Sequence, residues 1–388
     1  MKKLVIAAAL LAAVIGGCTY TPPAVGTSTT APVPASTVAT PPATTAATTS
    51  PEPADPVQIL LESMTTEEKV GQLFLARCPD TGALEDITKY HVGGYILFGR
   101  DFEYEIPGSI RARIADFQSA SRIPLLIAVD EEGGDVTRVS CFPTFRQSRF
   151  PSPRKLFDQG GMELVLRTEQ EKCELLRSLG INVNMAPVCD ITTERGAFMY
   201  TRSLGQDPQT TAQFVSEAVT LMTNNSIGSV LKHFPGYGNN KDTHTGIAVD
   251  NRTLETLATA DLIPFSAGID AQCGAILVSH TIVSCLDSDN PASLSSAVHD
   301  YLRCEMGYDG VIVTDDLVMK AIADRYGDGE AAVLAVLAGN DLLCSSNYPV
   351  QYAAVLEAVT TGRIDRELLD TAVARILNWK LTLGLFTP

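Results

Sequence analysis

Basic residues are scarce in this sequence of 388 residues, and a dinucleotide-binding GxGxxG is missing after its first predicted strand. The chain has 29 Lys and Arg against 45 Asp and Glu, a net charge of −16, which becomes −18 once Lys2 and Lys3 leave with the leader described below. This acidity argues against binding of nucleic acid or other polyanions through bulk electrostatics. No GxGxxG follows the first predicted strand, so the fingerprint of a dinucleotide-binding sheet is absent.

Cysteines with metal-binding spacing are also missing. The sequence contains no CxxC, and most of the eight cysteines after Cys18 lie within apolar runs: Cys78, Cys141, Cys173, Cys189, Cys273, Cys285, Cys304 and Cys344. Cysteine prefers burial even when it is unpaired, so we expect mostly buried thiols. A disulfide that involves Cys78 or Cys141 stays open, because such bonds form outside the cytoplasm.

The N-terminus has an apolar run that is too short for an ordinary membrane span of about 20 residues. Lys2 and Lys3 precede this run at 4–15, and Gly16, Gly17 and Cys18 follow it. This order of segments predicts a secretory signal, and its ending resembles a bacterial lipobox. We therefore predict a lipoprotein signal peptide at 1–17, lipidation of Cys18, and an exported protein anchored to the cell membrane. Plain secretion is the alternative.

Residues 18–56 are almost entirely Thr, Ala, Pro, Ser and Val, without apolar periodicity. Such a segment cannot bury enough surface to offset its ordering entropy, so we predict a disordered tether. The remaining residues, 57–388, have a normal length for one α/β barrel.

Short apolar runs recur in this part of the chain, with helical patterns between them. The runs are residues 71–77, 93–99, 124–130, 182–188, 228–234, 274–280, 310–316 and 340–346. Continuous apolar runs suit strands that are covered on both faces, as in a parallel sheet. Helices are predicted between them, for example at 163–180, closed by Gly180, and at 211–226. Eight strands alternating with helices favour the α/β class and a (β/α)8 TIM-type barrel over an open doubly wound sheet.

Polar residues stand where these predicted strands end. They are Asp130, Lys232, His233, His280, Asp315 and Asp316. One charged strand end is explained by a salt bridge or a helix N-cap, but several on one face of a barrel predict an active site.

Three segments resemble a known family: AVDEEGGDVTR at 128–138, KHFPGYGNNKDTH at 232–244, and PASLSSAVHDYLRCEMGYDGVIVTDDLVMKAI at 291–322. The family is glycoside hydrolase family 3, and the subgroup is its single-domain β-N-acetylglucosaminidases (β-N-acetylhexosaminidases). MTTEEKVGQLFLAR at 64–77 is similar to the family's opening helix and first strand. The resemblance covers nearly the whole predicted barrel in the right order.

The resemblance implies that Asp315 is the catalytic nucleophile, since it is the first Asp after the strand GVIVT. A covalent glycosyl-enzyme needs one ionised carboxylate that attacks the anomeric carbon. Asp316 is expected to cap the following helix instead.

Asp242 and His244 resemble the subgroup's acid–base dyad, which lies in the loop after the fifth strand. Imidazole titrates near neutral pH, so His244 can protonate the leaving oxygen and later deprotonate water, while Asp242 orients the ring. Other family members take an acid–base glutamate from a further C-terminal domain. We expect none here, because the chain ends soon after the eighth strand and its helix.

The same resemblance assigns substrate binding to five residues: Asp130, Arg138, Arg202, Lys232 and His233. Charge-assisted hydrogen bonds to sugar hydroxyls are about twice as strong as neutral ones. For the two arginines, the alternative is structural ion pairing with Glu131, Glu132 or Asp207. His280 is expected at most to line the wall of the site.

Two positions depart from the family pattern. Tyr237 stands where KHFPGHG usually has its second His, and we expect altered loop packing without loss of activity. Glu131 replaces a residue that is often His, and we expect it to add charge near the pocket rim.

These features predict a retaining β-N-acetylhexosaminidase that acts on terminal β-linked N-acetylglucosamine, for example in peptidoglycan fragments. We expect a monomer with a carbohydrate substrate, no nucleic acid partner, and no metal or organic cofactor. A phosphorylase with the same dyad is one alternative, since a histidine tolerates an incoming phosphate better than a glutamate does. A non-catalytic glycan-binding surface lipoprotein is the other.

Overall fold

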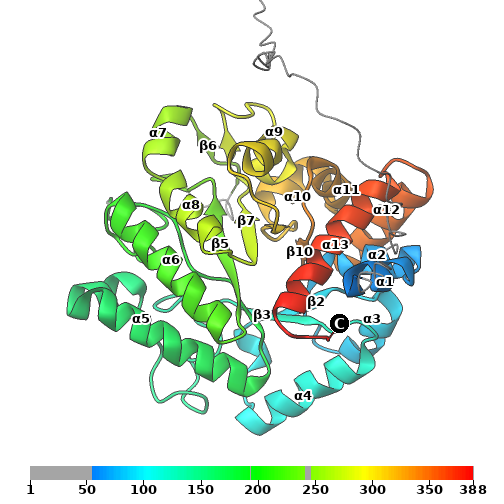
Figure 1. The fold of residues 1–388 in the computed structure, drawn as a ribbon, viewed down its shortest axis with the longest axis horizontal. Coiled ribbons are helices and arrows are strands. Elements are labelled where there is room, and N and C mark those ends of the chain that lie inside the picture. The colour runs from blue at the N-terminus through cyan, green and yellow to red at the C-terminus, as the bar shows by residue number, and fades with distance from the viewer. Residues whose placement is uncertain (1–54, 193, 241–245, 388) are drawn as a thin grey trace, which may run out of the picture. The chain divides into compact units, whose positions relative to one another are not determined.

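A barrel of eight parallel strands forms the centre of the computed structural model, which describes residues 55–192, 194–240 and 246–387 (Figure 1). The strand order is β10-β1-β2-β3-β4-β5-β7-β9, and every neighbouring pair is parallel. A parallel bridge between Val313 and Leu342 brings β9 beside the start of β10 and closes the ring. The predicted (β/α)8 barrel is confirmed.

Each predicted strand run contains one barrel strand. The strands are β1 Phe74–Arg77, β2 Gly94–Leu97, β3 Leu126–Val129, β4 Val183–Asn184, β5 Gly228–Phe234, β7 Ala275–Val278, β9 Val311–Thr314 and β10 Leu343–Ser345. Two further short strands, β6 Val249–Asp250 and β8 Ile282–Val283, pair with each other outside the barrel. The barrel strands are almost completely buried, as their continuous apolar sequences predict.

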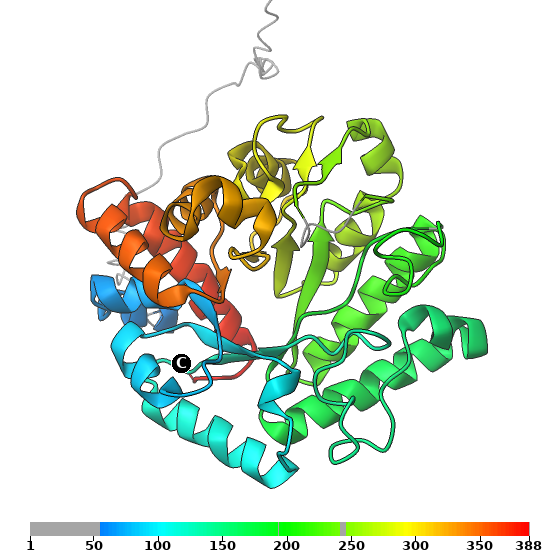
Figure 2. The same cartoon turned by 180° about the vertical axis from the view of Figure 1, so that it is seen from behind.

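Helices surround the barrel (Figures 1 and 2). They are α1 Pro56–Glu62, α2 Thr66–Gln72, α3 Ala83–Tyr90, α4 Pro107–Ala120, α5 Pro153–Leu179, α6 Pro208–Asn224, α7 Leu254–Thr259, α8 Leu262–Asp270, α9 Ser296–Asp300, α10 Lys320–Tyr326, α11 Asp328–Ala338, α12 Tyr348–Thr360 and α13 Arg366–Thr382.

The two predicted helices are present, and their ends follow local signals. Helix α5 ends as predicted at Gly180, which adopts the left-handed conformation with φ 86°. It starts ten residues earlier than predicted, where the Ser152 side chain caps it, and it bends at Gly160 and Gly161. Helix α6 begins at Pro208, because the Asp207 carboxylate accepts the main-chain N–H groups of the first turn.

A single tryptophan packs against the N-terminal end of the barrel. Trp379 of α13 lies against Gly228 and Gly274, which stand at or next to the starts of β5 and β7. A Cβ atom on Gly274 would lie 2.0 Å from Trp379 Nε1, so only glycine fits there. This end of the barrel is thus closed by packing, and polar side chains gather at the other end.

The cysteines are mostly buried, as expected. All eight described cysteines are free thiols, and five of them are buried. Neither Cys78 nor Cys141 forms a disulfide. In the described ranges, no helix combines the length and the apolar character that a membrane crossing requires.

Candidate active site

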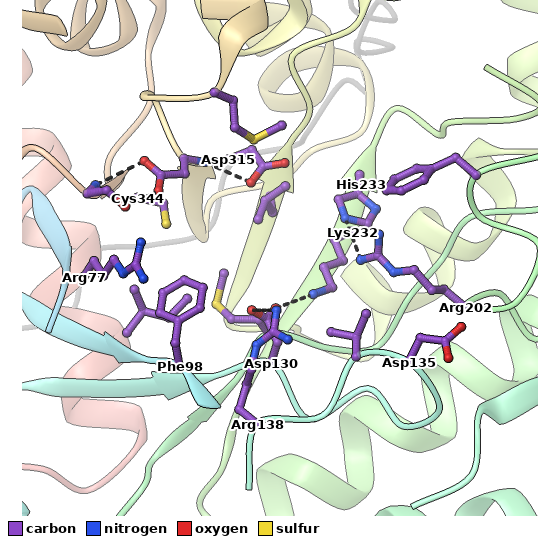
Figure 3. A pocket seen from close by; sticks show the side chains of 18 of the residues that line it. Arg77, Phe98, Asp130, Asp135, Arg138, Arg202, Lys232, His233, Asp315 and Cys344 are labelled. Atoms are coloured by element: carbon purple, nitrogen blue, oxygen red, sulfur yellow. Dashed lines mark hydrogen bonds and ion pairs between the residues drawn. The ribbon is translucent and has the colours of Figure 1, made fainter. Parts of the chain in front are cut away.

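A cavity of about 690 Å³ opens at the C-terminal ends of the barrel strands (Figure 3). Six residues that the sequence predicts for the site line it: Asp130, Arg138, Arg202, Lys232, His233 and Asp315. The barrel thus brings together side chains that are up to 185 residues apart in the sequence. The other predicted site residues, Cys18, Asp242 and His244, lie outside the described residues.

Lys232 is the most deeply buried cation of this cavity. Its side chain on β5 is 3% exposed, and Nζ donates to Asp130 Oδ1 at 2.7 Å. Nζ also lies 2.6 Å from Glu132 Oε1. Burial alone would lower the pKa of Lys232, but Asp130 and Glu132 raise it above its ordinary value. Lys232 is therefore an ammonium group that holds the Asp130 carboxylate at the cavity wall.

Glu132 ties a second cation to the first. Arg202 binds it through both ends of the guanidinium fork, Nε to Oε2 at 2.9 Å and Nη2 to Oε1 at 2.7 Å. Burial would raise the pKa of Glu132, but Arg202 and Lys232 lower it well below its ordinary value. Arg202 thus makes the structural ion pair that was its alternative role, and it still lines the cavity.

His233 is oriented by Asp190, which follows β4. The Asp190 Oδ2 atom accepts the His233 main-chain N–H at 3.1 Å and lies 2.8 Å from Nδ1. A carboxylate only accepts hydrogen bonds, so this contact assigns the proton to Nδ1. His233 Nε2 lies 3.2 Å from Arg202 Nη2 and accepts a hydrogen bond from it. The ring is thereby fixed as a neutral tautomer between a carboxylate and a guanidinium.

Tyr237 packs onto this histidine. Its main-chain N–H donates to Asp190 Oδ1 at 2.7 Å. Its ring is buried and meets the His233 ring edge to face, with centroids 5.2 Å apart and planes at 84°. Tyr237, which departs from the family pattern, therefore packs against the His233 ring and restricts its position.

Arg138 is positioned by contacts of its side chain and by a carboxylate that binds its main chain. Its Nη2 lies 3.6 Å from Asp130 Oδ2, and its guanidinium lies 5.5 Å from the centre of the Phe98 ring. The buried Glu131 carboxylate accepts the main-chain N–H groups of Arg138 and Val139, at 2.9 and 2.8 Å. The expectation that Glu131 adds charge to the rim is wrong, because its carboxylate turns inward and closes the loop.

Asp315 lies directly after β9, at the strand tip where the sequence places it. Its main-chain N–H donates to Val278 O at 3.3 Å, which continues the ladder with β7. Its Oδ1 accepts the main-chain N–H of Asp316 at 2.9 Å. The carboxylate is thereby oriented at the cavity wall (Figure 3).

Asp316 does not cap the next helix, so that prediction is wrong. Helix α10 begins four residues later, at Lys320, without a side-chain cap. Asp316 Oδ1 instead accepts the main-chain N–H groups of Val318 at 3.2 Å and Ser346 at 3.1 Å. Burial raises the pKa of this carboxyl group. Asp316 ties the loop after β9 to the loop after β10.

His280 is a structural residue. It is fully buried, with Nδ1 2.7 Å from Ser293 Oγ and Nε2 3.0 Å from the Asp316 carbonyl oxygen. It does not line the cavity, where it was expected to form part of the wall at most.

Asp190 and Glu132 were missed as site residues, although a signal for Asp190 exists. Asp190 follows the fourth apolar run, so the strand-end rule that selected Asp130 applies to it as well. Glu132 was considered only as an ion-pair partner, because sequence does not show which carboxylate an arginine meets. In the described part of the chain, no group of three or more His, Cys, Asp and Glu side chains is arranged to hold a metal ion.

Comparison with known sequences identifies one family. The profile described as the glycosyl hydrolase family 3 N-terminal domain matches residues 65–379. A curated relative, Beta-hexosaminidase LpqI of Mycobacterium tuberculosis, is 31% identical over 329 residues, which cover 82% of this chain and 83% of the relative.

Solved structures give the same family. A glycoside hydrolase family 3 β-N-acetylglucosaminidase from Paenibacillus sp. superposes with a TM-score of 0.78 at 35% identity. That match covers 84% of this chain, which spans 64% of the Paenibacillus chain. The M. tuberculosis LpqI structure has a TM-score of 0.76 at 28% identity and covers 84% of this chain and 96% of its own.

Proposed function

Since the chain belongs to glycosyl hydrolase family 3, we propose that it is a retaining β-N-acetylhexosaminidase. Its substrates would be terminal β-linked N-acetylglucosamine residues of glycans such as peptidoglycan fragments. The relatives named beta-hexosaminidase or β-N-acetylglucosaminidase support the sugar class. The observation that carries the proposal is one cavity in which Asp315 lies with a fixed set of cations and carboxylates.

The cation and carboxylate network suits a sugar ring. Asp130 accepts hydrogen bonds from hydroxyl groups, while Lys232 and Arg202 donate to hydroxyl oxygens. Lys232 and Arg202 are already held by Glu132, and Asp130 is held by Lys232, so binding costs little additional ordering of side chains. Charge-assisted hydrogen bonds then give orientation as well as affinity.

In the proposed reaction, a carboxylate oxygen of Asp315 attacks C1 of the sugar while the bond from C1 to the leaving oxygen breaks. His244 gives its proton to that oxygen, and Asp242 orients the imidazole. His244 then takes a proton from a water molecule that attacks C1, which releases Asp315 and the sugar. Two displacements at C1 retain the β configuration. Because Asp315 is the nucleophile, the substrate's acetamido group does not need to be.

We also propose that the protein acts outside the cytoplasm, held by a lipid on Cys18. The basic start, short apolar run and lipobox-like ending of residues 1–18 support this. In a bacterial host, the Cys18→Ser variant should leave the membrane fraction and appear with the soluble exported proteins. Retention of this variant in the membrane fraction would contradict lipidation at Cys18.

The function is tested with a chromogenic β-N-acetylglucosaminide, with the matching β-glucoside and β-xyloside as substrate controls. Asp315→Asn should lower kcat by about 1000-fold or more, and His244→Ala should lower it most for poor leaving groups. Asp309→Asn is the matched control, because Asp309 is exposed, and this variant should behave as wild type. A wild-type protein that is inert on every aryl N-acetylglucosaminide would refute the enzymatic function.

The same assay separates hydrolysis from phosphorolysis. We expect free N-acetylglucosamine as the product, at a rate that added inorganic phosphate does not increase. Faster turnover with phosphate, together with formation of the sugar 1-phosphate, would assign a phosphorylase instead.

A further inference from the structure

Arg252 joins two segments of the chain that flank the proposed acid–base dyad in the sequence. We call residues 236–240, which follow β5, the first stem, and residues 249–251, which include β6, the second stem. The dyad residues Asp242 and His244 lie between the two stems in the sequence. The resemblance to the family assigns no role to Arg252, and the proposed reaction does not use it.

The guanidinium group of Arg252 contacts both stems at once. Its Nη2 donates to the Gly236 carbonyl oxygen at 3.0 Å and to Asp250 Oδ2 at 2.7 Å. Its Nε lies 3.0 and 2.9 Å from the two carboxylate oxygens of Asp250. Its Nη1 donates to Asp261 Oδ2 at 2.7 Å. One side chain thus connects a main-chain carbonyl of the first stem, a carboxylate of the second stem, and a carboxylate at the start of α8.

The first stem has glycine at the two places where Arg252 and Asp261 approach its backbone. A Cβ atom on Gly238 would lie 2.7 Å from the guanidinium carbon of Arg252, and one on Gly236 would lie 2.5 Å from Asp261 Oδ1. Both glycines have a positive φ angle, 118° at Gly236 and 53° at Gly238. The sequence of this stem therefore permits a close contact that a larger residue at either position would prevent.

The two carboxylates that bind Arg252 are buried. Asp250 and Asp261 are each 2% exposed. Asp261 stands at the N-terminal end of α8, but its side chain does not cap that helix and binds Arg252 instead. Burial would lower the pKa of Arg252, but the two carboxylates raise it. A guanidinium that is fixed by two buried carboxylates restricts the position of the Gly236 carbonyl group that it also binds.

Both stems face a cavity beside Arg252. This second cavity has a volume of about 500 Å³, and residues of both stems line it together with Arg252 and Asp261. Free volume of this size gives the backbone of the stems room to shift once the guanidinium is removed. The contacts of Arg252 are therefore expected to determine how the stems are placed relative to each other.

We propose that Arg252 is a positioning residue for general acid–base catalysis, which fixes the two stems so that His244 reaches the leaving oxygen. This inference rests on the proposed role of His244 and adds a residue that acts through the backbone. A misplacement of about 1 Å can lower the rate of a reaction about 100-fold. The alternative is a purely structural role for Arg252, which would affect every substrate equally.

Aryl β-N-acetylglucosaminides with good and poor leaving groups separate the two roles. A 2,4-dinitrophenolate group leaves without a proton, whereas a phenolate group needs one from the general acid. Arg252→Met should lower kcat/KM about 100-fold for the phenyl glycoside and less than about 3-fold for the dinitrophenyl glycoside. Arg252→Lys should lower it about 10-fold for the phenyl glycoside, because an ammonium group keeps the charge but cannot span the three contacts.

Arg303→Met is the matched control. Arg303 also binds a buried carboxylate and a main-chain carbonyl, with Nη2 2.6 Å from Asp341 Oδ2 and Nη1 2.7 Å from Gly310 O. Gly310 directly precedes β9, at the end of the barrel opposite to the catalytic cavity. Urea unfolding should show that Arg303→Met loses stability, while the ratio of kcat/KM between the two glycosides stays as in wild type.

A double-variant cycle connects the effect to the dyad. His244→Ala alone should lower kcat/KM for the phenyl glycoside relative to the dinitrophenyl glycoside at least as much as Arg252→Met does. Once His244 is absent, adding Arg252→Met should change this ratio by less than about 3-fold, since two residues that act through one function are not additive.

An Arg252→Met variant that slows both glycosides equally would show a purely structural role and overturn the proposal. So would an unchanged ratio, or a further change of the ratio in the His244→Ala background. If circular dichroism shows that Arg252→Met does not fold, Arg252→Lys carries the test, and an unchanged ratio in that variant overturns the proposal. Failure of the proposed function is distinguishable, because wild type would then cleave neither glycoside, or His244→Ala would leave the ratio unchanged.

Discussion

Glu132 organises the site, and its replacement gives the most direct measure of that role. The Glu132 side chain is 1% exposed and receives three charge-assisted contacts, at 2.9 and 2.7 Å from Arg202 and at 2.6 Å from Lys232. Glu132→Gln keeps the shape of the side chain but leaves the buried Lys232 and the partly buried Arg202 with less compensating charge. Removing one partner of a buried ion pair costs about 3–5 kcal/mol. Lys232 keeps Asp130, so we expect a loss of about 3 kcal/mol in the free energy of unfolding at pH 7.

The expected pH dependence follows from the pKa of Glu132. The folded state lowers this pKa below its ordinary value of 4.5, so the stabilisation is present above pH 4.5 and is lost as the pH falls further. Urea unfolding of wild type and Glu132→Gln at pH 7 and pH 4 should show a difference that shrinks at the lower pH. Steady-state kinetics should show a lower kcat/KM for the variant, because Lys232 and Arg202 lose their fixed positions.

Glu131→Gln is the matched control for this experiment. Glu131 is the neighbouring buried carboxylate, and its contacts in the described structure are main-chain N–H groups and the Ser140 hydroxyl rather than cations. We expect a smaller loss of about 1 kcal/mol, because an amide oxygen still accepts those bonds. Equal losses in the two variants, or a Glu132→Gln loss that does not depend on pH, would refute the account of Glu132.

Three further outcomes are expected. Asp190→Asn places an amide donor against His233, so kcat/KM should fall about 100-fold and the His233 tautomer should change in nitrogen-15 NMR spectra; an unchanged tautomer would contradict its assignment. Arg252→Met leaves Asp250 and Asp261 without the cation that pairs with both, and urea unfolding should show a loss of about 3 kcal/mol in the free energy of unfolding at pH 8. Because burial raises the pKa of Asp261 to about 6, this loss should become smaller at pH 5, where Asp261 is protonated. Lys380 is fully buried against Gln72, and burial lowers its pKa to about 7. Lys380→Met should therefore raise the free energy of unfolding by about 3 kcal/mol below pH 7, and this gain should disappear as the pH approaches 10.5. A variant that is less stable than wild type at pH 6 would show that the buried ammonium group is compensated.

The strands could be predicted because the barrel buries them on both faces. Runs such as residues 124–130 and 228–234 are apolar without alternation, and each contains one barrel strand. Helix starts were less predictable, since α5 depends on a cap at Ser152 that precedes the apolar pattern. The rule that polar residues at strand ends gather at one face of a barrel selected five residues that line the cavity, Asp130, Lys232, His233, Asp315 and Asp316, and one that does not, His280. Arg138 and Arg202 were assigned by the resemblance to the family.

Side-chain partners were harder to predict, because they depend on contacts between distant segments. From the sequence, Glu131, Glu132 and Asp207 were all candidate ion-pair partners of the site arginines. In the structure Arg202 pairs with Glu132, and Asp207 caps α6. Glu131 and Asp316 each follow a site residue in the sequence, and the carboxylates of both bind main-chain N–H groups of loops, although Asp316 also lines the cavity. Carboxylates that are adjacent in sequence thus have different roles, and these roles depend on loop conformations that the sequence does not show.

Trapping of the glycosyl-enzyme tests the central claim most directly. A 5-fluoro N-acetylglucosaminide with a good leaving group should form the covalent intermediate faster than water removes it, since fluorine destabilises the positive charge in both transition states. Intact-mass spectrometry should then show the addition of one fluorinated N-acetylglucosaminyl group, and peptide mapping should locate it on Asp315. Normal hydrolysis without any adduct, or an adduct on another residue such as Asp316, would contradict the assignment of Asp315 as the nucleophile.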